Sequence, residues 1–309
     1  MILLTKVPAA YRLPAFVFVR SCYCMSVDYG EGIERMKKYL TVVFAAALAA
    51  VSVTGVFAGE AKSFRIATDT VFKPFEYPDE NGEQIGIDME ILAAIAEDQG
   101  FEYTLDVLGW DASIAACQAG QADGMIAGAS ITDERRESGW KFSDGYYFAT
   151  QSIAVEADSD IAGFEDLKGL TVGAKIGTQG ETYAMSLKDE YGFEVTSYED
   201  SPSMYQAVLG GQAAACFEDT PIMITTIEDQ DLDMKVVEGT ANEGSPYGFA
   251  IFSDEQQELL DLFNAGLANI VADGTYEEII AKYLGEAAAA DAVAAFAGNE
   301  TADTEADTE

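Results

Sequence analysis

The chain has 309 residues, of which 49% are hydrophobic, and it carries a net charge of −37 and no histidine. This length is typical of about two domains, and the apolar fraction suffices for a sizeable core. The negative charge argues against binding to nucleic acid, and the absence of histidine removes the usual general base and the commonest metal ligand. Composition therefore favours a soluble binding protein over an enzyme, and we expect no cofactor and no metal.

Residues 36–58 have the pattern of a secretory signal peptide. Lys37 and Lys38 precede a mostly apolar run, and the segment ends in small residues at Ala58. The run is short and alanine-rich for a membrane anchor, so we expect cleavage after Ala58. Residues 1–35 precede a complete signal, and we interpret them as a mis-assigned upstream start. The protein is expected to be exported, to the periplasm or the extracellular space.

From Phe64 onwards, short apolar runs alternate with segments of helical periodicity. The first series predicts the strands FRIATD, YTLDVL and ADGMIAG, separated by the helices DMEILAAIAEDQG and DASIAACQAG. We expect Asp88 and Asp111 to cap these two helices. The order strand, helix, strand, helix, strand is typical of an α/β sheet with parallel pairing.

A second series begins near Gln151, with the strands QSIAVEA, TVGAKIG, EVTSYED, AAACFED and MKVVEG and helices between them. A further strand, YGFAIFS, and two helices follow. Two such series predict two lobes, with the chain crossing between them twice. Residues 286–309 are acidic and of low complexity, and we expect a frayed helix that leads into a disordered tail.

Four cysteines occur in the chain. Cys22 and Cys24 form a short pair without a second pair at metal-site spacing. Cys117 and Cys216 fall in an expected helix and an expected strand. We expect two separate buried thiols there rather than a disulfide.

Three segments carry candidate binding residues. In the first, a strand ends at Gly128, and Ser130 adds a hydroxyl group. Thr132 is placed to cap a helix. Arg135 follows inside that helix, and its planar guanidinium can bind a carboxylate with two hydrogen bonds. An ordinary capped helix with Arg135 on its solvated face is the alternative. The second segment, 175–180, is a glycine-containing turn before a helix, which forms either an anion site or a routine turn. In the third, Glu218 and Asp219 follow an apolar strand, at the edge where open α/β sheets bind ligands.

Seven motifs occur in the order seen in the family of bacterial periplasmic polar amino-acid-binding proteins of ABC importers, the extracellular solute-binding proteins of family 3. They are ATDTVFKPFEY, GIDMEILAAIA, AGASITDERR, FSDGYY, the turn that begins at Lys175, FEDTP and ADGTYEEIIAKYLG. The chain resembles this family, and its glutamine-binding members most, from about residue 64 to 285. The resemblance implies the periplasmic-binding-protein-like (type II) α/β fold, in which a two-strand hinge joins two lobes around a ligand cleft.

The resemblance also implies how the backbone part of an amino acid is held. Its α-carboxylate would meet Arg135, helped by the backbone N–H groups of Ser130 and Gln179 in the turn that also contains Thr178. Its α-ammonium would meet the carboxylate of Asp219, the carbonyl of Gly128 and the hydroxyl of Ser130. Each charge of a zwitterion needs such a partner once it leaves water.

The side-chain pocket is implied in the same way. Phe72 and Trp110 match the aromatic walls of the family's cleft, whereas the bare sequence favours a core role for both. Asp69 and Lys175 match the positions that hold a side-chain amide in glutamine-binding relatives. Glu218 stands where those relatives have histidine. The resemblance therefore favours glutamine, with another polar amino acid or a basic one (arginine, lysine or histidine) as alternatives.

The expected mechanism is a hinged clamp that closes on its ligand and is then recognised by an ABC transporter permease. The expected lobes are residues 63–148 with 249–285, and residues 149–248, with crossovers near Ala149 and Gly248. We expect a monomer. Some family members are cyclohexadienyl dehydratases, so an enzyme in which Glu218 acts as the acid is the principal rival. The extracellular domain of a receptor is a second one.

Overall fold

The computed structural model describes residues 62–306 and the side chains of residues 62–296. The expected signal peptide, the expected upstream start, Cys22 and Cys24 lie outside the described residues. Among the helices of the described part, none combines the length and the apolar character that a membrane crossing requires.

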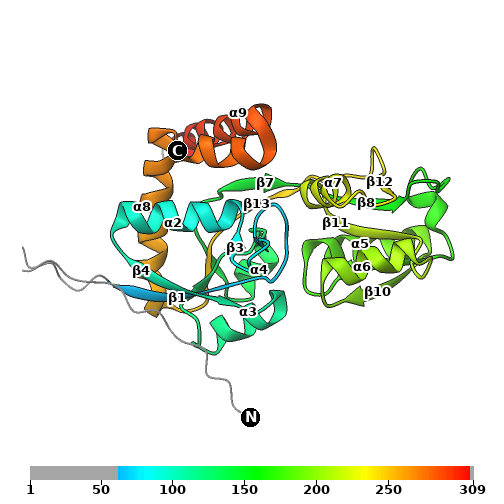
Figure 1. The fold of residues 1–309 in the computed structure, drawn as a ribbon, viewed down its shortest axis with the longest axis horizontal. Helices are drawn as coiled ribbons and strands as arrows, with labels where there is room; N and C mark the ends of the chain where they lie inside the picture. Colours follow the sequence, from blue (N-terminus) through cyan, green and yellow to red (C-terminus); the bar gives the residue numbers. More distant parts are fainter. Residues whose placement is uncertain (1–61, 307–309) are drawn as a thin grey trace, which may run out of the picture. The chain divides into compact units, whose positions relative to one another are not determined.

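The first lobe is built on a five-stranded sheet in the order β4-β1-β5-β14-β6 (Figure 1). β1 runs parallel to β4 and β5, whereas β14 runs antiparallel to both its neighbours. The strands are β1 (Ser63–Thr68), β4 (Glu102–Val107), β5 (Gly124–Met125), β6 (Lys141–Phe142) and β14 (Ala250–Ile251). The helices are α2 (Ile87–Gln99), α3 (Trp110–Gln118), α4 (Asp133–Glu137), α8 (Gln257–Asp273) and α9 (Thr275–Ala306).

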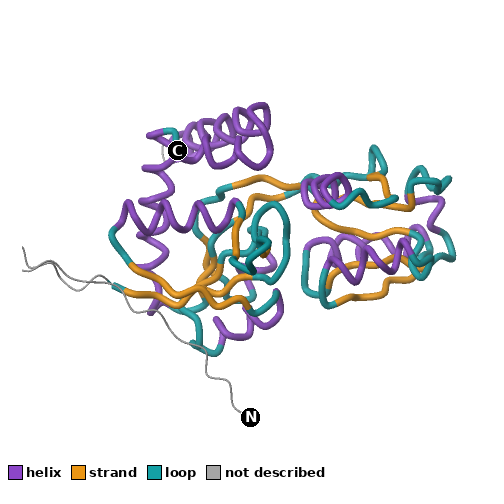
Figure 2. The backbone as a smooth tube through the Cα atoms, in the orientation of Figure 1, coloured by secondary structure: helices purple, strands orange, loops and turns teal. Residues whose placement is uncertain are grey.

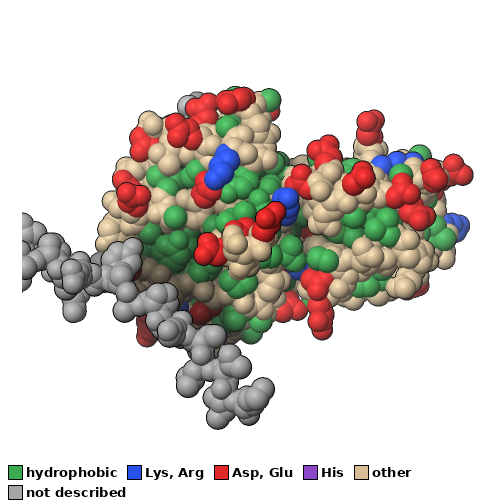
Figure 3. All heavy atoms as spheres, in the orientation of Figure 1, with side chains coloured by type: hydrophobic (Ala, Val, Ile, Leu, Met, Phe, Trp, Pro, Cys, Tyr) green, Lys and Arg blue, Asp and Glu red, His purple; other side chains and the backbone are tan. Residues whose placement is uncertain are grey.

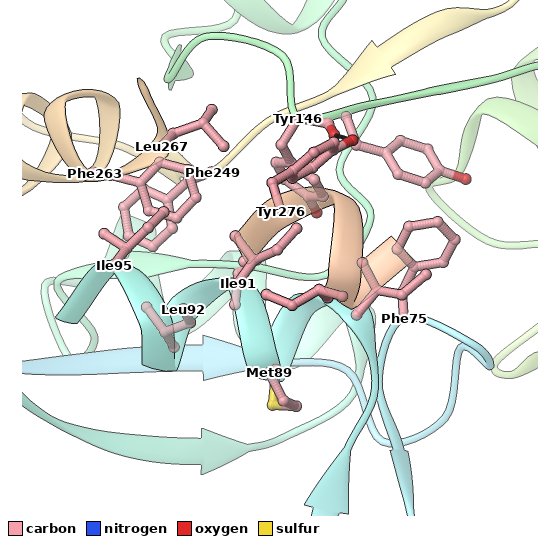
Figure 4. Close-up of a cluster of buried hydrophobic side chains, with 14 of the residues drawn as sticks. Phe75, Met89, Ile91, Leu92, Ile95, Tyr146, Phe249, Phe263, Leu267 and Tyr276 are labelled. Atoms are coloured by element: carbon pink, nitrogen blue, oxygen red, sulfur yellow. Dashed lines mark hydrogen bonds between the residues drawn. The ribbon is translucent and has the colours of Figure 1, made fainter. Parts of the chain in front are cut away.

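Alternation along β1 places helices on both faces of this sheet. Ile66 packs into the core formed with α2 and α8, while the next residue, Ala67, packs on the side of α3. Figure 4 shows the larger core, in which the rings of Phe249 and Phe263 stack with centroids 4.7 Å apart. A small ribbon of β2 (Tyr77–Pro78) and β3 (Gln84–Ile85) and a 3₁₀ turn, η2 (Asp254–Gln256), complete the lobe.

The second lobe has a five-stranded sheet in the order β10-β9-β11-β8-β12. Its strands are β8 (Gln151–Glu156), β9 (Thr171–Lys175), β10 (Glu194–Tyr198), β11 (Ala215–Asp219) and β12 (Met234–Val236). Its helices are α5 (Gln179–Tyr191), α6 (Ser201–Leu209), α7 (Thr220–Asp229) and the 3₁₀ turn η1 (Phe164–Leu167). Phe217 faces the α5 side of the sheet and Cys216 faces α6 and α7. The predicted two-lobed α/β architecture is confirmed.

Two strands carry the chain between the sheets. β7 (Tyr147–Ala149) and β13 (Ser245–Tyr247) run antiparallel and side by side (Figure 2). The sequence predicted one strand over YGFAIFS, but the structure divides it into β13 and β14 at Gly248. A Cβ at Gly248 would lie 2.8 Å from the Ile131 side chain, so the chain passes here at close range before it enters the first sheet.

The expected helix caps are correct at Thr132 and wrong at Asp88 and Asp111. Thr132 accepts a hydrogen bond from the Arg135 N–H at 3.2 Å. In contrast, α2 and α3 begin after glycines, and the two aspartates lie within the first turns. At Gly86 (φ 131°) a Cβ would lie 2.1 Å from the Phe75 carbonyl oxygen, so the close backbone approach requires glycine. Asp88 is thereby free to bind elsewhere.

The helix that the sequence predicted at the start of residues 286–309 is present as the second part of α9. α9 continues to Ala306 across a non-helical residue, Gly285. The reason is that apolar side chains recur at helical spacing: Ala289 is fully buried and Phe296 meets the ring of Tyr276 edge-on at 5.1 Å.

Two further features follow the sequence. Cys117 and Cys216 are free and buried, as predicted, on opposite lobes. Figure 3 shows acidic side chains spread over the visible face with few basic ones among them, as the net charge requires.

Candidate ligand-binding site

A small cavity, largely filled by its own lining side chains, lies where strand ends of the two sheets meet. All eleven residues that the sequence singled out line it, together with Ala127. They are Asp69, Phe72, Trp110, Gly128, Ser130, Arg135, Lys175, Thr178, Gln179, Glu218 and Asp219. Loops at the carboxyl ends of β1, β5, β9 and β11 bring them together, which is the usual position of a ligand site in an α/β sheet.

Arg135 is held in the cavity wall. Only 8% of the residue is exposed, which excludes the alternative of a solvated helix face. Its Nη1 donates to the Ser130 carbonyl at 2.9 Å, and its Nη2 donates to the Gly177 carbonyl of the second lobe at 3.2 Å. Burial lowers the pKa of Arg135 to about 10, so the guanidinium stays charged at neutral pH. A buried cation that lines a cavity is suited to an anionic ligand group.

Two indole rings flank this guanidinium. Its carbon lies 5.0 Å from the ring centroids of both Trp110 and Trp140. Trp110 belongs to the predicted site, but sequence reasoning missed Trp140. This residue follows α4, and its backbone N–H donates to the Arg135 carbonyl at 3.1 Å. A tryptophan five residues after a candidate arginine was the available signal.

Replacing Trp140 with leucine is expected to weaken ligand binding about 3- to 30-fold, because it removes one cation–π contact from a desolvated guanidinium and loosens its orientation. Calorimetry on the variant measures the loss, and the melting temperature reports any general damage to the core. Unchanged affinity in a folded Trp140→Leu protein would show that Trp140 does not orient Arg135.

Asp219 faces the cavity from the end of β11. It is buried, and its two carboxylate oxygens accept hydrogen bonds from Gln151 Nε2 and from the Tyr247 hydroxyl, each at 2.5 Å. Burial raises the pKa of Asp219, opposed by these two donors and by Arg135. Gln151 and Tyr247 were missed by sequence reasoning. Tyr247 is the last residue of β13 and Gln151 follows β7 closely, so the anchors of Asp219 lie where the chain crosses between the lobes.

Lys175 and Asp69 form an ion pair across the cavity, with side chains 2% and 3% exposed. The Lys175 Nζ also lies 5.4 Å from the centroid of the Phe72 ring. Burial disfavours the charged amine, but Asp69 and Glu218 outweigh it and raise the pKa of Lys175. The pair is therefore charged and mutually neutralised.

Glu218 adds a second carboxyl group beside Lys175. It is fully buried and accepts a hydrogen bond from the Ser201 hydroxyl at 2.5 Å. Burial and the neighbouring Asp219 raise its pKa to about 7, and Lys175 acts in the opposite direction. This carboxyl therefore holds its proton to higher pH than an ordinary glutamate does.

The turn after β9 supplies a helix N-terminus. α5 begins at Gln179, and Thr178 caps it by accepting a hydrogen bond from the Glu181 N–H at 3.4 Å. Gly177 has φ 72°, a conformation that glycine adopts without strain. The positive end of the helix dipole therefore lies beside the cavity, next to Arg135, and favours an anionic group there.

The fold and this cavity define the class: a two-lobed α/β protein with a hinge and a charged cleft, the architecture of periplasmic binding proteins. The family model of the bacterial extracellular solute-binding proteins, family 3, matches residues 64–286, and the chain belongs to this family.

Individual relatives agree with this membership. The chain is 30% identical to the histidine-binding periplasmic protein of Escherichia coli K12, over 80% of this chain and 97% of that protein. It is 31% identical to the arginine-binding extracellular protein ArtP of Bacillus subtilis, over 80% and 98%. Among solved structures, an ancestral arginine-binding protein bound to glutamine matches with a TM-score of 0.67 and 32% identity, over 72% of this chain and 98% of that one.

Proposed function

We propose that this protein captures a polar L-amino acid outside the cytoplasm and delivers it to the permease of an ABC transporter. The observation that carries the proposal is the placement of buried Arg135 and buried Asp219 at one cavity, on opposite lobes. A zwitterion presents one negative and one positive charge a few bonds apart. The two side chains match these two charges. Both charges of the ligand are removed from water only when the lobes close around it.

The clamp that we propose has residues 63–148 with 249–285 as one lobe and 149–248 as the other, with β7 and β13 as the hinge. Export by the signal at 36–58, cleavage after Ala58 and a monomeric state belong to the same proposal. The names of the relatives support this proposal, because they describe periplasmic or extracellular proteins that bind histidine or arginine.

A panel of the twenty L-amino acids, screened by their effect on the melting temperature, tests the proposal. A ligand that binds the native state raises the melting temperature in proportion to RT ln(1 + [L]/Kd). We expect a rise with glutamine and smaller or no rises with apolar amino acids. A protein that responds to none of the twenty, after refolding to remove any bound ligand, would refute the function.

Glutamine is the ligand that the side-chain pocket favours. Lys175 already neutralises Asp69, so a neutral amide enters without an uncompensated charge, accepting from the lysine and donating to a carboxylate. Glu218 is the argument for a basic ligand, because it offers an additional carboxylate when ionised. Relatives are named for both kinds of ligand. Two are named for the basic amino acids histidine and arginine, and the ancestral arginine-binding protein is bound to glutamine.

Replacing Lys175 with methionine is expected to lower glutamine affinity at least about tenfold and to raise the affinity for arginine or lysine, since the carboxylates of Asp69 and Glu218 then lack a cation. Competition calorimetry of glutamine against arginine measures the ratio. Lys168→Met, at an exposed lysine of the same lobe, is the matched control. An unchanged ratio in Lys175→Met would show that the ion pair does not set specificity.

The raised pKa of Glu218 is the specific feature that supports the enzymatic rival, because a general acid must hold its proton near neutral pH. Turnover of prephenate or arogenate would establish that function. We expect neither to react, since Asp219 and Arg135 account for the capture of an intact amino acid.

A further inference from the structure

Two buried carboxyl groups lie behind the cavity without lining it. Glu76 and Asp88 are both 0% exposed. Neither oxygen of Glu76 has a hydrogen-bond partner within the described residues, and the same holds for Oδ1 of Asp88. Buried polar atoms without partners are rare and costly, so this arrangement requires an explanation.

The two residues hold neighbouring parts of the cavity wall, because a Cβ at Gly128 would lie 2.5 Å from the Phe72 ring. The Phe72 N–H donates to the Glu76 carbonyl at 2.6 Å, and the Glu76 N–H donates back to the Phe72 carbonyl at 3.2 Å. Oδ2 of Asp88 accepts from the Gly128 N–H at 2.9 Å and from the Tyr146 hydroxyl at 2.9 Å. Phe72 and Gly128 both line the cavity. Glu76 therefore holds Phe72 through its backbone, and the Asp88 carboxyl holds the backbone of Gly128, whose carbonyl we assign to the ligand's ammonium group.

The hydrogen bonds distinguish the two carboxyl groups. Oδ2 of Asp88 accepts two hydrogen bonds, as an ionised carboxylate does. The carboxyl group of Glu76 accepts none within the described residues. The Asp88 N–H donates to the carbonyl of Phe75, the residue before Glu76, at 2.9 Å, so Glu76 and Asp88 project from adjoining backbone segments. A proton on Glu76 that points to Oδ1 of Asp88 gives a partner to one oxygen of each residue and removes the repulsion between two buried anions.

The charged surroundings agree with this assignment. Burial raises the pKa of Glu76 well above its ordinary range, and Asp88 and Asp69 add to the effect while Lys175 opposes it. Burial raises the pKa of Asp88 to about 7, against the hydrogen bonds from Gly128, Tyr146 and Glu76. Glu76 is thus the group that keeps its proton to higher pH.

We propose that Glu76 and Asp88 share one proton, held on Glu76 at neutral pH, and that this pair positions Gly128 and Phe72 for the ligand. The predicted effect on ligand binding rests on the proposed function. The shared proton can be tested whether or not the protein binds an amino acid. The geometry that supports binding is kept while Glu76 holds its proton and is lost as the pH rises through the raised pKa of Glu76. The contribution of this proton to the free energy of unfolding is full only below the ordinary pKa of a glutamate, and it declines as the pH rises from there to the raised pKa of Glu76.

Two matched variants test the assignment. Glu76→Gln supplies a neutral donor to Asp88, so we expect binding within about threefold of wild type at neutral pH and no loss at alkaline pH. Asp88→Asn removes the anion that accepts from Gly128 and Tyr146, and we expect a loss of about tenfold or more. Glu80→Gln, at an exposed carboxyl of the same segment, is the control and should keep the wild-type pH profile.

Infrared spectroscopy locates the proton without any ligand. At neutral pH the wild type should show the carbonyl stretch of buried protonated carboxyl groups, and subtracting the spectrum of Glu76→Gln should leave one such band, which belongs to Glu76 and not to Glu218. Glu76→Gln should also flatten the fall in melting temperature towards alkaline pH. The proposal is overturned by absence of the band from the wild type, by a wild-type pH profile in Glu76→Gln, or by unaltered binding in Asp88→Asn.

These results separate the two proposals. If no amino acid binds the wild type, the proposed function fails, yet the infrared band and the melting profile still decide the shared proton. If glutamine binds and the band is missing, the shared proton fails alone. Should either variant not fold, the band that remains in Glu218→Gln, followed from neutral to alkaline pH, gives the same decision.

Discussion

Replacing Arg135 with methionine is expected to lower the affinity for every amino acid ligand at least about 100-fold, or about 2.7 kcal/mol. The guanidinium is buried, and it donates hydrogen bonds to two carbonyl groups, which carry no full negative charge. A ligand carboxylate supplies the anion that the guanidinium lacks. Methionine has similar length and no charge, so the α-carboxylate would be desolvated without a cation. Calorimetry with glutamine, or with the ligand that the panel identifies, measures the loss.

The neighbouring arginine provides the control. Arg136 is exposed on the same short helix, and Arg136→Met should bind like the wild type. Arg135→Lys keeps the charge but loses the planar fork, so we expect an intermediate loss. Binding within threefold of wild type in Arg135→Met would contradict the assignment of the carboxylate to Arg135.

Replacing Asp219 with asparagine is expected to reduce affinity by about 100-fold, because the α-ammonium group loses its buried counter-ion. The amide oxygen retains one of the hydrogen bonds from Gln151 and Tyr247, so the geometry of β11 changes little. The loss should therefore appear in binding rather than in the melting temperature, and the two measurements together distinguish a lost charge contact from a damaged fold.

Asp189→Asn, at an exposed aspartate of α5, is the matched control for the removal of one negative charge from a very acidic protein. It should leave binding unchanged. If Asp219→Asn and Asp189→Asn weaken binding to the same small extent, the effect belongs to the overall charge of the protein, and the ammonium site has to be sought elsewhere.

The sequence predicted the lobes and the cavity lining because both depend on local pattern. Strands and helices alternate with clear periodicity, and candidate residues such as Gly128, Lys175 and Asp219 follow strands whose carboxyl ends meet at one edge. The seven motifs added residues that composition alone places in the core, notably Phe72 and Trp110. All of them line one cavity in the structure.

The residues that support the site could not be predicted in the same way. Trp140 reaches Arg135 only through the packing of the segment after α4, and Tyr247 meets Asp219 only because the hinge strand passes β11. Asp88 is a preferred type of helix-cap residue and precedes a run of helical periodicity. Its actual role depends on the approach of the Phe75 backbone to Gly86, a contact between segments that the local pattern does not contain.

The central claim is that this protein recognises both charges of an amino acid, and charge-deleted ligands test it most directly. Calorimetric titration would compare L-glutamine with glutaramate, which lacks the α-amino group, and with 4-aminobutanamide, which lacks the α-carboxyl group. We predict one-to-one binding of glutamine and affinities at least about 100-fold lower for both analogues. Failure of all twenty amino acids to bind, or an analogue that binds within tenfold of its parent, would contradict the account.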